Sequence, residues 1–419
     1  MDRHPRTHRT AGAEDGARHA KHLRALNLQR VLAVAMDRAS SFTRSELSEG
    51  TGLSAPTVGS LVSELIQLGI VLDRGAGPSS GGRRPSRMEF NARYGYVAGI
   101  DLGPTRTRLA IADLRGEPVA QRIVPTPSAL GPAALLARIA SALRALMKDA
   151  EAPPQRLLAV GAGAPGAVDT HHGTVGMAPN LRGWLDVPMR DILQRALEAP
   201  VIVENDVNLA LLGEHWRGAA RGHATCAFVF VGRGIGAAIL IDGHLHRGHN
   251  YMAGEIALMC VGPQYIDVEF GSRGCLETLA GVEALAARWP RVGEADPARR
   301  VSALMESARE GDGEARRAVE ETARLIAIAV ANVATVVDPS LIVLGGGLLV
   351  QAEPLFQAIR GTVRRILRTP VDIVPSALGQ EAPLSGALLV ASREARRQLR
   401  HLTREAPARA ALAGRRISS

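Results

Sequence analysis

The sequence Leu53-Ser54-Ala55-Pro56-Thr57-Val58-Gly59-Ser60-Leu61-Val62-Ser63-Glu64-Leu65 predicts a short amphipathic helix. Serine is a residue type that caps helices, and Pro56 falls in the first turn, where a helix does not need the missing N–H. Val58, Leu61, Val62, Leu65 and Leu68 recur at helical spacing. We therefore expect this apolar stripe to be buried and the small polar residues between its members to be exposed.

The flanking residues predict two preceding helices and a following pair of strands. Leu28, Val31, Leu32 and Met36 repeat at helical spacing, and residues 43–49 form a short helix that ends at Thr51-Gly52. Helix, helix, tight turn and helix is the order of a helix-turn-helix unit, whose last helix enters the major groove. Residues 70–72 and 88–90 are expected to pair around Gly81-Gly82-Arg83-Arg84-Pro85 as the wing of a winged helix.

This pattern indicates a DNA-binding transcription regulator. Small residues in the first turn let a helix approach DNA closely, and arginines neutralise phosphates or enter the minor groove. The predicted DNA-contacting residues are Arg44, Ser54, Thr57, Ser60, Arg83 and Arg84, with Arg74 and Arg87 as further phosphate contacts. The alternative is a helical hairpin for protein contacts with a solvated charged loop.

The charge distribution agrees with DNA binding at one end of the chain. Residues 1–93 contain 14 Lys and Arg against 9 Asp and Glu, and residues 393–419 contain 8 against 2, within a total net charge of +9. The middle of the chain is therefore slightly acidic and has no general affinity for polyanions.

Composition limits the remaining possibilities. A chain of 419 residues with 46% hydrophobic content can form about three domain-sized units. No apolar run is long enough to span a membrane, and the first thirty residues lack the apolar stretch of a signal peptide. Three cysteines, Cys226, Cys260 and Cys275, are too few for a disulfide framework. We expect a cytoplasmic protein without a membrane partner.

A second, α/β domain is expected after the wing. Residues 96–113 read as a strand, the turn Asp101-Leu102-Gly103-Pro104-Thr105, and a second strand. Later apolar segments end in polar or glycine clusters at 204–206, 232–236 and 345–347. Such clusters at strand ends are where open α/β sheets bind ligands, and an acid beside a glycine turn can hold a magnesium-bound phosphate.

These motifs together resemble the ROK family of repressors and sugar kinases, from about residue 21 to residue 395. The matching segments are the wing at 81–85, the turn at 101–105, and the runs 204–208, 232–236, 253–256, 271–277 and 345–347. The resemblance implies an α/β, two-lobed, actin-like ATPase fold of the sugar kinase type, usually dimeric or tetrameric. The N-terminal winged helix-turn-helix places the chain with the repressors.

The resemblance also implies a sugar site and, in the kinases of the family, a catalytic base. The sugar contacts carry over onto Asn180, Asn205, Asp206, Glu255 and Glu277. Asp206 stands at the position of the general base. Carboxylates and amides suit vicinal hydroxyls because each forms directional hydrogen bonds. The alternative for Asp206 is that it only caps the helix that begins near Val207.

Two departures from the family pattern fall in the nucleotide site. Family kinases usually have a second glycine in the first turn, where Pro104 here removes an N–H donor, and threonine in the second loop, where this chain has Arg233.

The family's zinc ligands are also replaced, because Leu258, Val268 and Phe270 occupy ligand positions and Cys275 alone remains. We expect apolar packing to brace this loop, with neither zinc nor ATP as cofactor. The cluster His244, His246 and His249 is expected to be a solvated loop.

Three interpretations follow. The first is a homodimeric or homotetrameric repressor of carbohydrate genes that binds an inverted-repeat operator and senses a sugar, without being an enzyme. The second is an ATP-dependent sugar kinase with a DNA-binding unit, and the third is a regulator with a vestigial cleft. The expected parts are a disordered basic tail at 1–20, the winged helix at 21–93, the kinase-like domain at 94–395 and a basic tail at 396–419.

Overall fold

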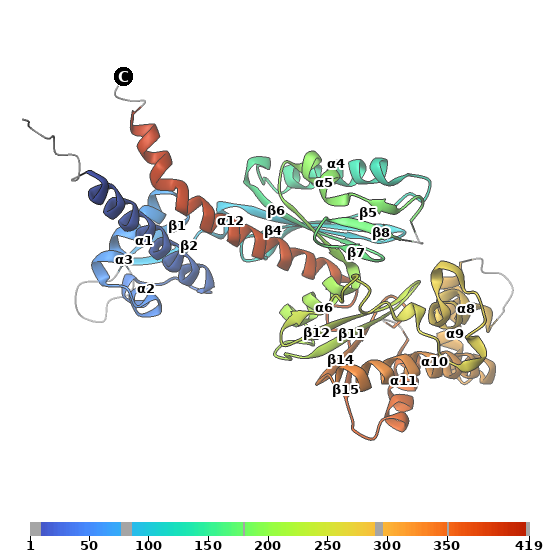
Figure 1. Ribbon diagram of the computed structural model, residues 1–419. Helices are drawn as coiled ribbons and strands as arrows, with labels where there is room; N and C mark the ends of the chain where they lie inside the picture. Colours follow the sequence, from blue (N-terminus) through green and yellow to red (C-terminus); the bar gives the residue numbers. More distant parts are fainter. Residues whose placement is uncertain (1–9, 77–85, 179–180, 290–295, 350–351, 416–419) are drawn as a thin grey trace, which may run out of the picture. The chain divides into compact units, whose positions relative to one another are not determined.

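The computed structural model describes residues 10–76, 86–178, 181–289, 296–349 and 352–415 (Figure 1). The chain divides into two compact units. Unit 1 comprises residues 1–96, 113–117 and 392–419, and unit 2 comprises residues 97–112 and 118–391. Within the described ranges, no helix combines the length and the apolar character that a membrane span requires.

The N-terminal part of unit 1 begins with three helices and a two-stranded antiparallel sheet. The elements are α1 (Thr10–Asp37), α2 (Arg44–Thr51), α3 (Ala55–Gln67), β1 (Val71–Ala76) and β2 (Ser86–Phe90). In the sheet Val71 pairs with Phe90, and Phe42 adds a bridge to Met88. The predicted helices and strands are all present, in the order expected of a winged helix.

Local sequence explains where α2 and α3 begin and end. Thr43 and Glu46 form a capping box, and Gly52 ends α2 with a left-handed backbone. Val58, Leu61, Val62 and Leu65 are buried, which confirms most of the predicted stripe of α3. Leu68 instead remains 37% exposed because it caps the helix rather than continuing its face.

Both expected basic tails differ in the structure. The chain is helical from Thr10, and the helix α12 (Ala382–Arg415) extends through most of the expected C-terminal tail. Both segments are rich in alanine and arginine, which favour helices. In unit 1, Arg396 pairs with Asp37 at 2.9 Å and Gln29 donates to the carbonyl of Arg400. Residues 392–400 of α12 therefore pack as part of unit 1.

The turn at 113–117 also belongs to unit 1, which moves the expected boundary at residue 93. Leu114 donates its N–H to the carbonyl of Ala92, next to the short 3-10 helix η1 (Ala92–Tyr94). Arg115 donates to the carbonyl of Arg38 at 2.7 Å and covers the ring of Phe90. These contacts attach the turn to the core of unit 1.

Unit 2 contains two five-stranded sheets with the same strand order. The first sheet is β10-β6-β3-β4-β5 and the second is β13-β12-β11-β14-β15. Their strands are β3 (Tyr96–Leu102), β4 (Arg106–Asp113), β5 (Pro118–Pro125), β6 (Leu157–Ala164), β10 (Val201–Asn205), β11 (Cys226–Val231), β12 (Ile235–Ile241), β13 (His244–Leu245), β14 (Leu341–Gly345) and β15 (Asp372–Pro375). In each sheet the first strand is central, the second and third follow as a meander, and the fourth and fifth lie on its other side. This is the two-lobed α/β fold that was expected.

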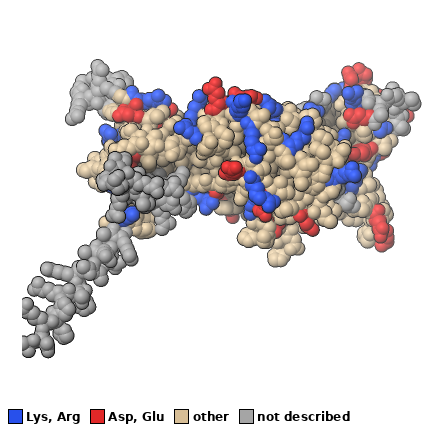
Figure 2. Space-filling model, turned by 90° about the horizontal axis from the view of Figure 1, so that it is seen from above, with Lys and Arg blue, Asp and Glu red and all other residues tan. Residues whose placement is uncertain are grey.

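Helices and a small sheet complete the two lobes. They are α4 (Pro132–Asp149), η2 (Pro154–Arg156), the sheet of β7 (Val168–Asp169), β8 (Thr174–Met177) and β9 (Leu185–Val187), α5 (Met189–Leu197), α6 (Asp206–Arg217), η3 (Ile256–Leu258), η4 (Pro263–Tyr265), η5 (Gly271–Arg273), α7 (Cys275–Ala280), α8 (Val282–Ala287), α9 (Pro297–Glu310), α10 (Gly313–Val337), α11 (Glu353–Ile366) and η6 (Gly379–Glu381). The largest core of the second lobe is made mainly of alanine, valine, leucine and isoleucine, in agreement with the low aromatic content, and it includes Trp289 and Phe356. Figure 2 shows basic and acidic side chains interspersed over the visible face of the molecule.

Helices α6 and α12 cross at glycines. A Cβ at Gly386 would lie 1.9 Å from the carbonyl oxygen of Leu209, and one at Gly213 would lie 2.2 Å from that of Ala382. A Cβ at Gly161 on β6 would lie 2.0 Å from the carbonyl oxygen of Ala387. Backbone therefore rests on backbone where α12 passes between α6 and the first sheet.

Replacing Gly386 by alanine is expected to destabilise the protein by about 3 kcal/mol or more, because no flexible side chain can move out of the way. Gly361 is the matched control, since it lies within α11 and a Cβ there would meet nothing within 4 Å. Gly361→Ala is expected to stabilise by about 0.5–1 kcal/mol. Urea unfolding of both variants measures the difference, and an equal effect of the two would contradict the described crossing.

Candidate functional site

A cavity of about 860 Å³ lies in unit 2, and its walls come from both sheets. The β3–β4 turn at 103–105 and the β11–β12 turn at 232–234 line it, and these turns occupy equivalent places in the two sheets. The glycines 346 and 347 after β14 line it as well. The glycine clusters predicted at strand ends thus converge on one cleft.

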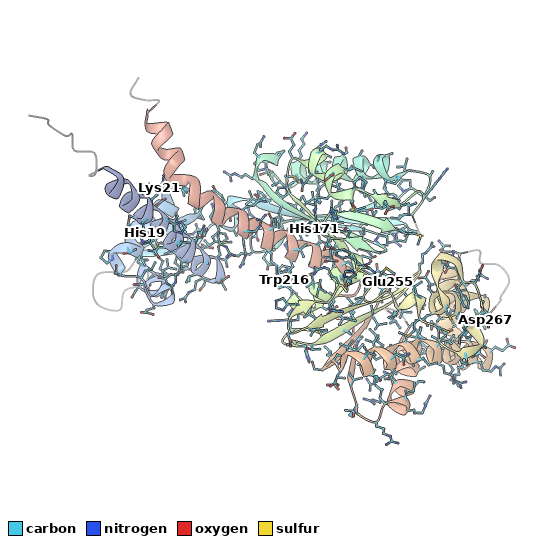
Figure 3. The ribbon with its side chains drawn as sticks, in the orientation of Figure 1. His19, Lys21, His171, Trp216, Glu255 and Asp267 are labelled. Atoms are coloured by element: carbon cyan, nitrogen blue, oxygen red, sulfur yellow. The ribbon has the colours of Figure 1, made fainter. Side chains whose placement is uncertain are left out.

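Four predicted sugar residues line this cavity together: Asn205, Asp206, Glu255 and Glu277. Glu255 lies where the second lobe faces the first (Figure 3). The fifth, Asn180, lies outside the described residues. The sequence motifs therefore lead to one site although they are separated by up to 72 positions along the chain.

Asn205 and Asp206 stand where β10 passes into α6. Asn205 is the N-cap, since its side-chain oxygen accepts from the backbone N–H of Asn208 at 2.9 Å, and its amide group donates to the carbonyl of Gly166. The alternative in which Asp206 is the cap is therefore wrong. Asp206 lies in the first helical turn with its side chain open to the cavity.

The carboxylates of the cleft are partly desolvated. Burial raises the pKa of Asp206 to about 8, and the nearby carboxylates of Asp101 and Glu255 add to the shift. Burial also raises the pKa values of Glu255 and Glu277. Glu277 accepts a hydrogen bond from the N–H of Ile235 at 3.1 Å, which orients it toward the β11–β12 turn. A protonated carboxyl donates and a carboxylate accepts, so the cluster can serve both roles toward hydroxyl groups.

A glycine and an ion pair with one buried partner position the loop of Glu255. Gly254 has φ +93°, and a Cβ there would lie 2.0 Å from the carbonyl oxygen of Ala237, so only glycine brings this loop against β12. Arg247 on the same loop binds the buried Glu204 of β10 through Nε and Nη2 at 2.8 and 2.6 Å. This pair joins the loop of Glu255 to the strand that ends at Asn205. No motif predicted this pairing of Glu204 with Arg247, because nothing local in the sequence shows that residues 43 positions apart meet.

The expected zinc loop is braced differently from the prediction. Cys275 is buried, but Leu258 and Val268 are 49% and 48% exposed, so apolar packing at these two positions was a wrong expectation. The sharp turns of the loop direct them outward. Only Phe270 packs, edge-to-face against Tyr265 with ring centroids 6.1 Å apart. In the described part of the chain, no three His, Cys, Asp or Glu side chains are grouped to hold a metal ion, the exposed cluster at 244–249 included.

Four of the predicted DNA-contacting residues lie in α2 and α3 or at the start of α3, and their exposure can be described. Arg44, Ser54 and Ser60 are exposed and Thr57 is half-buried, while Ser54 and Thr57 share a hydrogen bond at 2.8 Å. Ser54 is the N-cap residue by position, but its side chain makes no capping bond to the backbone. The predicted Arg83 and Arg84 lie outside the described residues.

Three further arginines of unit 1 are tied to neighbouring side chains. Arg87 donates to the backbone and side chain of Ser41, and Arg74 pairs with Glu89, so these two predicted phosphate contacts are engaged within the protein. Arg24 of α1, which the sequence analysis missed, reaches Ser60 and Glu64 on α3. It adds a positive charge beside the exposed face of α3.

The chain has two equivalent five-stranded sheets around a cleft lined by carboxyl groups, which is the arrangement of an actin-like protein. Three helices and a two-stranded sheet precede these sheets in the sequence and form an added N-terminal unit. Residues 97–394 match the ROK family, so the chain belongs to the ROK family. It is 30% identical to a xylose repressor of Caldicellulosiruptor bescii over 82% of this chain and 88% of that protein. It is 31% identical to a glucokinase of Streptomyces coelicolor over 70% of this chain and 96% of that protein.

Two solved structures illustrate the same relationship. A ROK family transcriptional regulator, a homologue of the MLC protein of E. coli, matches with a TM-score of 0.72 at 21% identity and covers 91% of this chain and 99% of that chain. A ROK family glucokinase from Streptomyces griseus in complex with glucose and AMPPNP matches with a TM-score of 0.62 at 30% identity, over 71% of this chain and 100% of that chain. The first of these shares the fold over most of both chains.

The raised pKa of Asp206 predicts that stability falls as pH rises. From the ordinary value of 3.8 up to about 8, the folded protein holds a proton that the unfolded chain has lost. Asp101, with a pKa of about 6, adds to the slope only in the lower part of this range. Between pH 6 and 8, Asp206→Asn is expected to remove a slope of up to about 1.4 kcal/mol per pH unit.

Urea unfolding at a series of pH values measures this slope. Asp242→Asn, at an exposed turn, is the control and is expected to leave the slope as in the wild type. An unchanged slope in Asp206→Asn would contradict a proton held on this residue.

Proposed function

We propose that the protein is a sugar-responsive, DNA-binding transcriptional repressor of carbohydrate uptake or catabolism genes. The observation that carries the proposal is the presence, in one chain, of three helices followed by a two-stranded antiparallel sheet, and of a cleft lined by Asn205, Asp206, Glu255 and Glu277. Xylose repressors align with more than four fifths of this chain. Glucokinases align with about 70% of it or less, a share similar to that of the family match.

On this proposal, α3 presents Thr57 and Ser60 to base edges, Arg44, Arg83 and Arg84 hold phosphates or the minor groove, and the N-cap Ser54 lies near the DNA backbone. A homodimer or homotetramer would place two such helices on an inverted repeat. The cleft would take a sugar, and no membrane partner is needed. We place the protein in the cytoplasm, where the DNA is.

The alternative is an ATP-dependent sugar kinase that carries a DNA-binding unit. The retained Asp206, open to the cavity, favours it, as does the likeness to glucokinases. Against it, Pro104 lacks the N–H that the first turn would direct to a phosphate. A vestigial cleft is the less favoured interpretation, because four separated motifs still bring hydroxyl-binding side chains to one cavity.

Replacing Arg83 and Arg84 together by alanine is expected to weaken binding to every DNA sequence. The slope of log K against the logarithm of the salt concentration is expected to become shallower by about one or somewhat more. The test compares a duplex from upstream of the protein's own gene with a scrambled duplex, at several salt concentrations. The matched control is the exposed pair Arg364 and Arg365 of α11, replaced in the same way. Equal slopes for the two double variants would refute the role given to the wing.

A sugar that fits the cleft is expected to change DNA affinity by about 5- to 150-fold, the usual range of coupling between two sites. D-xylose and D-glucose are the first probes, because the relatives include xylose repressors and glucokinases. Glu255→Gln should abolish the response while sugar-free DNA binding stays as in the wild type. The exposed Glu353→Gln is the control. A normal response in Glu255→Gln would mean that the effector binds elsewhere.

A further inference from the structure

The nucleotide half of the cleft contains an arginine that the family pattern does not explain. The fold implies a magnesium-bound nucleotide between the two glycine turns, where Asp101 at the end of β3 would face the metal. A metal there needs an acidic side chain that is free to bind it. The structure allows this requirement to be tested at Asp101 itself.

Arg108 already occupies the position beside Asp101. It lies on β4, two residues beyond Arg106, so both side chains leave the same face of the strand. Its Nη1 lies 3.4 Å from Asp101 Oδ2, and its Nη2 donates to Gln380 Oε1. Its Nε lies 3.7 Å from Glu381 Oε1. Nη1 and Nη2 thus donate to acceptors of the protein, while Nε is buried without a hydrogen-bond partner and only faces Glu381 as a nearby charge.

The exposure of the two side chains makes this arrangement persistent. The side chains of Arg108 and Asp101 are only 15% and 7% exposed, and both line the cavity. Arginine cannot lose its charge in a protein, and separating a buried pair leaves an uncompensated charge on each side. A magnesium ion would have to displace the guanidinium from Asp101 and find a place for it elsewhere in the cleft. The residues present therefore do not fit a metal-bound nucleotide.

We propose that Arg108 closes the nucleotide half of the cleft by taking the place of the metal ion beside Asp101. The Arg108 side chain neutralises the buried carboxylate of Asp101. It also joins the strand that follows the β3–β4 turn to Gln380 and Glu381, which precede α12. The sugar half, at Asp206, Glu255 and Glu277, stays open. On this proposal, Arg108 itself prevents nucleotide binding. The glycine turns at 103–105 and 232–234 are retained and need not have changed.

Isothermal titration with magnesium and ADP tests this assignment on the full-length protein. The wild type is expected to bind ADP with a Kd no lower than about 1 mM. Arg108→Ala is expected to bind ADP at least about tenfold tighter, and only when magnesium is present. Arg108→Met is the second variant, because it keeps the apolar stem and protects the fold if the alanine variant unfolds. Arg106→Ala, which removes an exposed charge from the same face of β4, should remain as weak as the wild type.

Three results would overturn the proposal. They are tight magnesium-dependent binding by the wild type, a gain in Arg106→Ala equal to that in Arg108→Ala, and no gain in a folded Arg108→Ala or Arg108→Met. The inference rests on the non-enzymatic part of the proposed function and concerns the nucleotide half alone. Operator binding and the sugar response of the wild type, measured on the same preparation, test the repressor function separately.

Discussion

The glycine crossing of α6 and α12 is the constraint on which the cleft depends. Each of Gly161, Gly213 and Gly386 lets a carbonyl oxygen of the neighbouring element come closer than any Cβ would allow. The crossing fixes both ends of the site at once, because α6 begins at Asp206 and α12 begins just after Gln380 and Glu381. Without it, the carboxyl cluster and the arginine that faces Asp101 would have no common frame. Packing of backbone on backbone is also stiff, since no side chain can adjust to a shift.

The same strand order in both lobes explains why separated motifs meet. In each sheet the turn after the first strand reaches the cleft, at 103–105 in one lobe and 232–234 in the other. The fourth strands of both sheets, β6 and β14, likewise end at the cavity, in Pro165-Gly166 and in Gly346-Gly347. The cavity therefore lies between two copies of one architecture, and side chains alone distinguish its proposed sugar half from its proposed nucleotide half.

Local features of the site and fold could be predicted from the sequence, and non-local ones could not. The stripe of α3, the end of α2 at Gly52 and the polar clusters at strand ends follow from periodicity and turn chemistry. Two of the partners of Arg108, Gln380 and Glu381, lie 272 and 273 positions away, and the partners of Glu204 include Arg247 on another lobe. No pattern within either segment identifies these pairs. The exposure of Leu258 and Val268 was missed for a related reason, because hydrophobicity alone does not show which way a turn directs a side chain.

Charge balance in the cleft connects the proposed exclusion of nucleotides with the proposed sensing of a sugar. Four acidic side chains line the cavity: Asp101, Asp206, Glu255 and Glu277. Of the arginines that line it, Arg108 is the least exposed, and it is already paired with Asp101. Burial raises the pKa values of Asp206, Glu255 and Glu277, which favours the protonated form of these carboxyl groups. A neutral polyol adds no charge and offers hydroxyls that both donate to carboxylates and accept from protonated carboxyls. The site is thus electrostatically suited to an uncharged sugar, and the internal guanidinium makes it so without a bound metal ion.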